Sequence, residues 1–167
     1  SGLTSLGAYA FFQCTVLPTI NIPSGITEIK EYMFYECKAL KSITLPNGIT
    51  TIEQFAFQSC EALTSVNIPS AVTRIDHAAF SNCNAITKVY ITDLSAWCKI
   101  TFAREISNPV NNRQWDSNLG RYTYPDLYLG NTKVTDLVIP SDITEIKPFA
   151  FFGYKGLTSI TIPDSVT

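Results

Sequence analysis

The sequence contains a single histidine, His77, and no two cysteines in a C-x-x-C arrangement. An ordinary zinc site needs several such ligands at close spacing, and the glycine-rich phosphate loop of nucleotide-binding proteins is also missing. His77 and Cys98 would have to touch in order to act as base and nucleophile, but they belong to different parts of different repeats. The sequence therefore predicts no enzyme activity, no cofactor and no metal site.

Charged residues are scarce, at 16% of 167 residues, and the net charge is −2 with no basic cluster. A nucleic-acid surface requires such a cluster, so no nucleic-acid partner is expected. No apolar run approaches the roughly 18 residues that a membrane-spanning helix needs, so this segment is not expected to insert into a membrane. The 46% of hydrophobic residues is nevertheless enough for a packed core.

What the chain has in abundance is internal repetition, with a period of 23 residues. The stretches "LPTINIPSGITEIKEYMFYECKA", "LKSITLPNGITTIEQFAFQSCEA" and "LTSVNIPSAVTRIDHAAFSNCNA" follow one another without a gap over 17–85. A partial copy precedes them at 3–16, a fourth begins at 86–92, a fifth covers 134–156, and half of a sixth covers 157–167. Periods of this length indicate a solenoid, in which each repeat forms one coil.

Each copy has the same internal pattern. Apolar residues at its fourth and sixth positions alternate with polar ones, as in a short strand with one buried face. Proline then ends the strand because it cannot donate a ladder hydrogen bond. A second extended piece such as "ITEI" follows, and the "EYMFYEC" segment is expected to be a 3₁₀ or single α turn. One coil alone buries too little to fold, so the coils must stack and pair their strands.

Stacking predicts columns of similar side chains. Phenylalanine recurs at position eighteen of the repeat, as Phe11, Phe34, Phe57, Phe80 and Phe151. Cysteine recurs at position twenty-one, as Cys14, Cys37, Cys60 and Cys83, with Tyr154 in its place in the fifth copy and Cys98 outside the register. These cysteines are expected to be free buried thiols, because their spacing belongs to the repeat; disulfides between adjacent coils and metal binding are the alternatives.

The unit L-x-x-I-x-I-P-x-x-V-T-x-I-x-x-x-A-F-x-x-C resembles the BspA-like class of leucine-rich repeats. The resemblance implies a leucine-rich repeat solenoid over 1–167, curved and right-handed, with a parallel sheet on its concave side and mostly short parallel strands. It also implies a bacterial cell-surface or secreted protein, extracellular in location, that is used in adhesion or in binding host proteins. The array begins and ends within a repeat, so we expect the chain to be part of a longer protein.

The fourth copy leaves the repeat at Asp93, and a non-repeat insert is expected over 93–133. Asp93 is placed to cap a short helix that contains Trp97, "KITF" is a candidate strand, and Gly130 and Asn131 suit the tip of a hairpin. The D-L-x-x-W-C-x-I segment is similar to an alternative unit of BspA-like proteins. Long insertions in solenoids fall on one edge, which is often the binding edge.

Two interpretations of the surface remain open. The candidate partner-binding residues are outward residues of the first strands and aromatic residues of the insert: Asn67, Lys88, Tyr90, Trp115, Tyr122 and Tyr124. If these rings are exposed and clustered, they form a surface for a host or matrix protein or a glycan. If they pack against the coils, the chain is a structural spacer that displays other domains and has no ligand of its own. Trp97 and Phe102 are expected in the core.

Overall fold

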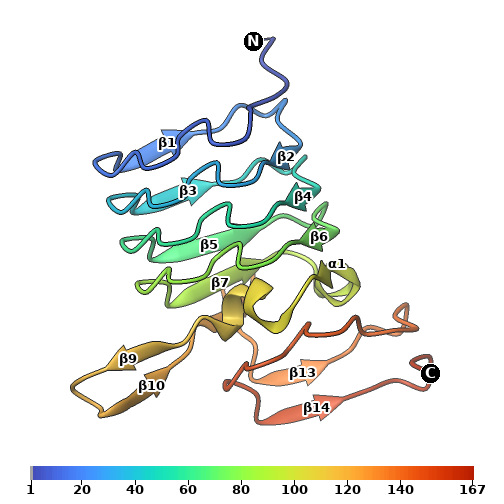
Figure 1. Cartoon of the computed structure of the whole chain (residues 1–167). Helices are drawn as coiled ribbons and strands as arrows, with labels where there is room; N and C mark the ends of the chain where they lie inside the picture. Colours follow the sequence, from blue (N-terminus) through green and yellow to red (C-terminus); the bar gives the residue numbers. More distant parts are fainter. Residues whose placement is uncertain (1) are drawn as a thin grey trace.

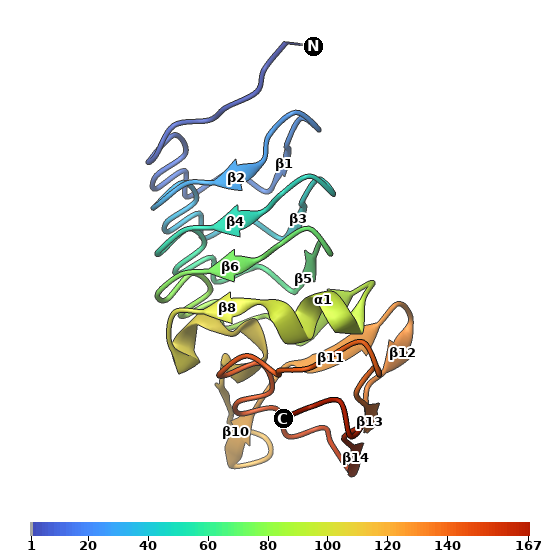
Figure 2. The same cartoon turned by 90° about the vertical axis from the view of Figure 1, so that its right-hand side faces the viewer.

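The computed structural model describes residues 2–167 and shows a solenoid of stacked coils with two parallel ladders of strands (Figures 1 and 2). The first strands of successive coils are β1 (Thr19–Asn21), β3 (Ser42–Thr44), β5 (Ser65–Ile68) and β7 (Lys88–Ile91). The second strands are β2 (Glu28–Ile29), β4 (Thr51–Ile52), β6 (Arg74–Ile75) and β8 (Thr101–Phe102). Ile29 is in register with Ile52 and Ile52 with Ile75, so each coil repeats its neighbour at a 23-residue offset. The predicted leucine-rich repeat solenoid is confirmed.

A single column of phenylalanine rings runs through the core from Phe11 to Phe80, as predicted, but Phe151, the fifth expected member, makes no ring contact with it among the described residues. The ring centroids of Phe11 and Phe34 are 5.4 Å apart, those of Phe34 and Phe57 are 5.2 Å apart, and those of Phe57 and Phe80 are 5.2 Å apart. The rings are within 9° of parallel, and the last three are fully buried. Each ring therefore provides one wall of the site that its neighbour occupies.

The cysteine column has a specific role beside these rings. The thiols of Cys37, Cys60 and Cys83 each donate to the carbonyl oxygen of the phenylalanine 26 residues earlier, at 3.1, 3.1 and 2.9 Å. Cysteine is small and largely apolar but still carries a donor, so it suits a buried position beside a free carbonyl. All five cysteines are free. Tyr154, which replaces cysteine in the fifth copy, also donates to a carbonyl, but to that of Val134 in its own coil.

The segment between the second strand and the next coil is a run of tight turns rather than the helical turn expected from the sequence. Alternate amides leave the coil: the N–H groups of Tyr32, Phe34 and Glu36 donate to carbonyls of the next coil at 2.8–3.2 Å. To aim them outward, Tyr32 and Glu36 adopt left-handed φ values of 53° and 54°. A helical turn would direct these amides along its own axis, and the stack would lose this set of bonds.

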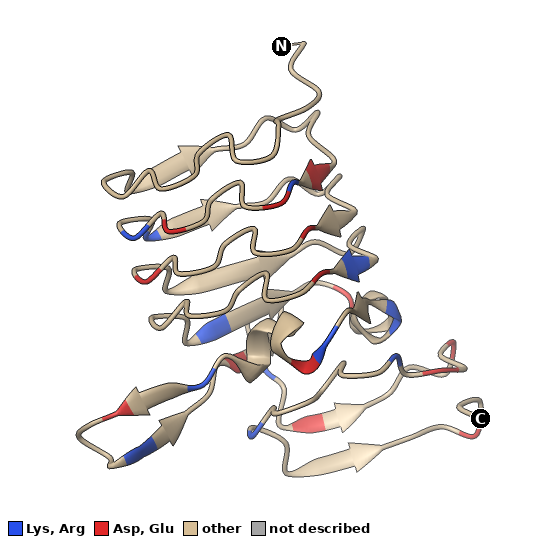
Figure 3. Ribbon diagram, in the orientation of Figure 1, with Lys and Arg blue, Asp and Glu red and all other residues tan. Residues whose placement is uncertain are grey.

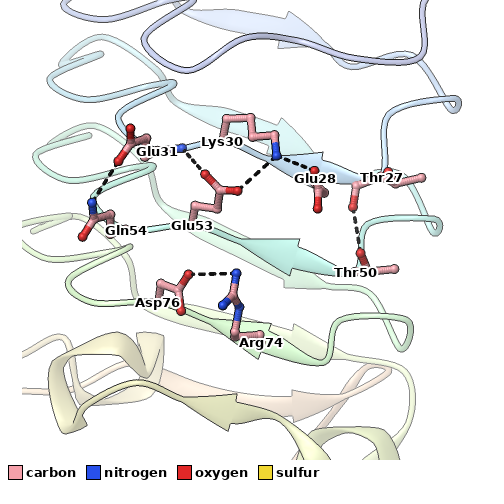
Figure 4. A network of polar contacts seen from close by, with 9 residues as sticks. All are labelled: Thr27, Glu28, Lys30, Glu31, Thr50, Glu53, Gln54, Arg74 and Asp76. Carbon is pink, nitrogen blue, oxygen red and sulfur yellow. Dashed lines mark hydrogen bonds and ion pairs between the residues drawn. The ribbon is translucent and has the colours of Figure 1, made fainter.

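Polar side chains just after β2 and β4 also connect their two coils (Figure 4). The ammonium group of Lys30 lies 3.2 Å from the Glu53 carboxylate, whose other oxygen accepts the Glu31 N–H at 2.9 Å. The amide of Gln54 donates in turn to the Glu31 carboxylate at 2.8 Å. These contacts are exposed or only partly buried, so each contributes little on its own, but together they favour the same register as the core columns.

The first part of the predicted insert continues the solenoid. Helix α1 (Leu94–Lys99) is capped by Asp93, whose carboxylate accepts the Ala96 N–H at 3.0 Å, as predicted. Strand β8 follows and pairs in parallel with β6, so α1 and β8 together complete the fourth coil (Figure 2). Trp97 and Phe102 are buried and meet edge to face with centroids 5.3 Å apart, which confirms their predicted place in the core.

The chain then leaves the stack and returns. Two short 3₁₀ turns, η1 (Glu105–Ser107) and η2 (Pro109–Asn111), lead to an antiparallel hairpin of β9 (Gln114–Asp116) and β10 (Arg121–Thr123) that projects from the solenoid (Figure 1). Strand β11 (Asp126–Leu129) comes back and pairs in parallel with β7. Strand β12 (Thr132–Lys133) pairs antiparallel with β11, so the predicted hairpin at Gly130 and Asn131 is confirmed.

The last two strands, β13 (Asp136–Val138) and β14 (Ser159–Thr161), form a separate two-stranded parallel sheet because β12 occupies the free edge of β11. Side chains of the insert join this part to the rest. The buried amide of Asn108 donates to the carbonyls of Phe149 and Ala150 at 2.7 and 2.9 Å, and the Trp97 indole N–H donates to Ala150 at 2.9 Å. Within residues 2–167, no helix is both long and apolar enough to cross a membrane.

Candidate functional site

The structure places three of the predicted binding residues on the outer face of one four-stranded sheet. Asn67 on β5 is directly opposite Tyr90 on β7, and Tyr90 is opposite Tyr128 on β11, with the two tyrosine rings 5.3 Å apart. The ammonium group of Lys88 lies 5.7 Å from the centroid of the Tyr128 ring. We call Asn67, Lys88, Tyr90 and Tyr128 the sheet patch.

Tyr128 is the member of the sheet patch that sequence reasoning missed. In "DLYL" it alternates with Leu127 and Leu129, as Tyr90 alternates with apolar neighbours in "KVYI". That alternation predicts a strand, but the pairing of the strand with β7 spans the whole hairpin and is not a local property. The sequence therefore indicated that Tyr128 lies in a strand, but not which strand it pairs with.

Two further predicted residues meet on the β9–β10 hairpin. Trp115 and Tyr122 are paired across the two strands, and their rings lie edge to face with centroids 5.2 Å apart. Trp115 is 60% exposed and Tyr122 is 50% exposed. The guanidinium carbon of Arg113 lies 4.8 Å from the centroid of Tyr122, which is a cation–π distance. We call Arg113, Trp115 and Tyr122 the hairpin patch.

The hairpin is held at both of its ends. At its base, the amide of Asn112 donates to the carbonyl of Cys83 at 2.7 Å, and the amide of Gln114 donates to the carbonyl of Ile86. At its tip, one carboxylate oxygen of Asp116 accepts the N–H groups of Asn118 and Leu119 at 2.9 and 3.1 Å. These bonds order the turn before any partner arrives, which lowers the entropy that binding would cost.

Tyr124 belongs to neither patch. It is half-buried, and the ammonium group of Lys155 lies 5.7 Å from its ring. Within residues 2–167, no ring contact joins Tyr90 to Trp115, because Tyr90 pairs with Tyr128 and Trp115 pairs with Tyr122. The surface that the sequence suggested as one cluster is thus divided between the sheet and the hairpin.

A hollow of about 690 Å³ lies beside the base of the hairpin. Its lining comes from the turn of the coil 63–85, the η1–η2 segment, the ends of the hairpin and the turn of the coil 134–156. Sequence reasoning missed it, because its lining residues are spread over 81–155 and only the folded chain brings them together, through the pairing of β11 with β7 and the side-chain bonds of Asn108 and Asn112. We call it the insert hollow.

The buried thiols are poor candidates for chemistry. Burial raises the pKa of Cys37 to about 12, and burial followed by the nearby Asp142 carboxylate raises that of Cys98 to about 11. The pKa of Cys60 is also raised, by its contact with the Cys83 thiol and by burial. Among the residues that the structure describes, no group of three histidine, cysteine, aspartate or glutamate side chains is placed to hold a metal ion.

The native protein should react slowly with a thiol reagent such as DTNB at pH 8. For Cys37, a rise in pKa from 9.0 to about 12 lowers the thiolate fraction about a thousandfold, and burial also blocks access. Only the half-buried Cys14 is expected to react within minutes. The same protein in urea should release five equivalents, which is the control for reagent and concentration. Rapid reaction of two or more thiols in the folded chain would contradict the buried cysteine column.

Comparison with known proteins identifies the repeat. The family model described as the BspA type leucine rich repeat region matches residues 1–107 and 124–167, in six copies. The model leaves out 108–123, which contains η2, β9 and β10. No curated protein matches the chain. The hairpin patch therefore lies in a part of the chain that the family pattern does not describe.

Three solved structures are similar to the chain over nearly its whole length. A leucine rich cell surface protein from Faecalibacterium prausnitzii is 33% identical over 94% of the chain and 38% of its own, with a TM-score of 0.47. The T. pallidum leucine rich repeat protein is 20% identical over 94% of the chain and 62% of its own, with a TM-score of 0.56. A leucine-rich repeat protein from Bacteroides ovatus is 18% identical over 96% of the chain and 58% of its own, with a TM-score of 0.44. The chain spans less than two thirds of each of these proteins.

Proposed function

Since the chain belongs to the BspA type leucine-rich repeat family, we propose that it is a non-enzymatic binding module of a bacterial surface or secreted protein. Its partner is an extracellular host or matrix protein, held by the hairpin patch. The similarity to a leucine rich cell surface protein supports this location. The family supplies the scaffold, and the segment outside the family pattern supplies the contact residues.

The exposure of Trp115 is the observation that carries this proposal. A large aromatic side chain is costly to leave in water, yet Trp115 is 60% exposed and Tyr122 beside it is 50% exposed. Tryptophan, tyrosine and arginine are the residue types that dominate binding energy at protein interfaces, and the hairpin patch consists of one of each. A spacer without a ligand has no use for such a group on a projecting hairpin.

We favour a protein over a glycan as the partner of the hairpin patch because of the shape of the patch. Trp115 and Tyr122 are exposed on a narrow two-stranded hairpin that projects from the solenoid (Figure 1), so they form a knob suited to a pocket in another protein. Polar side chains such as Asn84, Ser117 and Asn118 border the patch and can bind the backbone groups of a protein partner, while Arg113 lies against the Tyr122 ring. The sheet patch, with its half-buried Tyr90, provides a broader secondary contact beside β11.

A binding screen of the purified chain against a panel of matrix glycoproteins tests the proposal. Each glycoprotein is presented with its glycans and after enzymatic deglycosylation. For any partner found, Trp115→Ala should weaken binding about 30-fold or more, as expected for a central contact worth at least 2 kcal/mol. Tyr90→Ala should have a smaller effect, because Tyr90 lies on the sheet patch.

The matched control is Val138→Ala, since Val138 is 62% exposed on β13, away from the hairpin, and should leave affinity unchanged. Equal affinity of the wild type and the Trp115→Ala variant would reject the hairpin patch as the site. Loss of binding on deglycosylation would instead assign the partner's glycan as the ligand. A chain that binds no member of the panel would favour the spacer.

A further inference from the structure

The insert hollow has the size and construction of a ligand site beside the hairpin patch, with which it shares Arg113. Its volume of about 690 Å³ lies within the usual range of small-molecule pockets, roughly 300–1,000 Å³. Its walls are fixed by side chains. Asn108, 1% exposed, ties the η2 segment to the coil 134–156, and Asn112 ties the hairpin base to Cys83. The hollow is therefore formed before a ligand arrives.

Gly153 shows that the packing around the hollow is specific. This position of the repeat has a left-handed φ of 77° in the coil 134–156, and other copies carry a side chain here, such as Asn82 in the coil 63–85. A Cβ atom on Gly153 would collide with the side-chain oxygen of Asn111. Only glycine leaves room for Asn111, whose amide donates to the carbonyl of Glu105 at 3.1 Å and so holds η1 against η2.

The charge at the hollow is opposite in sign to that of the chain. Arg113 and Lys155 line it, together with a single carboxylate, Glu105. None of these three side chains forms an ion pair within residues 2–167, whereas Lys133 and Lys147 nearby pair with acidic neighbours. Figure 3 shows Lys and Arg segments in and beside the β9–β10 hairpin. Arg113 and Lys155 each lie over a tyrosine ring but have no acidic partner in the described part of the chain, so they favour a ligand that carries an acidic group.

The remaining lining combines rings with amides. Tyr124 and the 49% exposed Phe152 provide flat apolar faces, against which the C–H face of a sugar ring can pack. Asn82 and Asn84 are exposed and make no side-chain hydrogen bond among the described residues, so both their donors and their acceptors are available to hydroxyl groups. A site for an apolar ligand would lack these amides, and a site for a simple anion would lack these rings.

An extended acidic peptide fits the hollow less well. Every lining residue lies in a turn, a 3₁₀ turn or a loop, and none lies in a strand, so no strand edge is available for a peptide to extend. We propose that the insert hollow is a second binding site, for a short saccharide that bears a carboxylate or sulfate group. Arg113 and Lys155 bind the acidic group, Tyr124 and Phe152 pack against sugar rings, and the asparagine amides bind hydroxyls.

Calorimetric titration of the whole chain with four probes tests this site. The probes are trigalacturonate, a sulfated heparin disaccharide, neutral maltotriose and a hexaglutamate peptide. One or both acidic saccharides should bind at least about tenfold more tightly than maltotriose, since charge-assisted hydrogen bonds are the strong ones. Which of the two binds more tightly distinguishes a carboxylate site from a sulfate site. Added salt should weaken this binding, because Arg113 and Lys155 are exposed to solvent and dissolved ions screen their attraction for the acidic group.

Variants of the lining residues provide the decisive comparison. Lys155→Gln should weaken the acidic saccharide about tenfold, and Glu105→Gln should strengthen it about threefold, because a like charge is removed. Lys41→Gln, an exposed lysine on another coil, is the matched control and should change nothing. Thermal unfolding of each variant is measured alongside, so that a folding defect is recognised as such. Trp115→Ala should leave saccharide binding intact, which separates this site from the hairpin patch.

Several results would overturn the proposal. These are equal affinity for maltotriose and the acidic saccharides, tighter binding of hexaglutamate than of either saccharide, no effect of Lys155→Gln, and no saccharide binding at millimolar concentration. Failure of the matrix-protein screen has no bearing on this outcome. That screen tests whether protein binding depends on Trp115, whereas the titration tests whether saccharide binding depends on Lys155 and Glu105.

Discussion

Phe57→Ala should lower the free energy of unfolding by about 3–5 kcal/mol, the usual cost of truncating a buried phenylalanine. Phe57 is fully buried between Phe34 and Phe80, with both ring centroids 5.2 Å away. Its removal leaves a cavity that the neighbours cannot fill, because each is fixed by its own coil. The loss is measured by urea unfolding followed by circular dichroism. If the variant does not fold, Phe57→Leu provides a milder version, with an expected loss of about 1–2 kcal/mol.

The matched control for this prediction is Phe152→Ala. Phe152 also lies in the turn of a coil, but it is 49% exposed and its main ring contact is Phe149 alone. Its truncation should cost about 1 kcal/mol or less, as is usual for exposed positions. A loss at Phe57 no larger than that at Phe152 would show that the column contributes no special stability, and would falsify the stacking account of this fold.

Trp97→Ala should also cost about 3–5 kcal/mol, but its effect should be concentrated in one part of the chain. The Trp97 ring is 1% exposed and packs on Phe102, while its indole N–H donates to the carbonyl of Ala150 at 2.9 Å. This side chain thus connects the fourth coil to the coil 134–156. Urea unfolding measures the total loss, and hydrogen exchange should show faster opening of the amides over 134–167 than over 17–85.

Trp115→Ala is the matched control, because it removes the other tryptophan from an exposed hairpin and should change stability by about 0.5 kcal/mol or less. Trp97→Phe separates packing from hydrogen bonding. It keeps most of the ring and should cost about 1–2 kcal/mol, since Asn108 still donates to Ala150. Uniform loss of exchange protection along the whole chain in Trp97→Ala would contradict the localised role.

The repeat made the stack predictable because one spacing repeats one set of contacts. Once Phe34 and Phe57 are placed 23 residues apart in coils of equal length, their rings must lie one above the other. The turns were less predictable, because bulky residues such as Tyr32 and Phe55 are seldom expected at positive φ. Hydrogen bonds to the next coil stabilise that conformation, and they are a property of the stack rather than of the local sequence.

Within the insert, local signals were sufficient for local features. Asp93 predicted its helix cap, and Gly130 with Asn131 predicted a hairpin, because both effects act over a few residues. The pairing of β11 with β7 joins segments on either side of a projecting hairpin, and no local pattern specifies it. Both Tyr128 in the sheet patch and the whole insert hollow depend on that pairing, so the sequence could name the aromatic residues but not the surfaces they form.

The small strand β12 has a mechanical consequence. Because it covers the edge of β11, it interrupts the ladder, and β13 and β14 pair only with each other. The coils that contain β13 and β14 are therefore attached to the rest of the stack by isolated bonds, such as those from the Val134 N–H to the Leu127 carbonyl and from the Lys147 N–H to the Cys98 carbonyl. When a force pulls the coil 134–156 away from the coils before it, the array should yield first at this seam. The phenylalanine column would then stay whole while the end beyond it peels away.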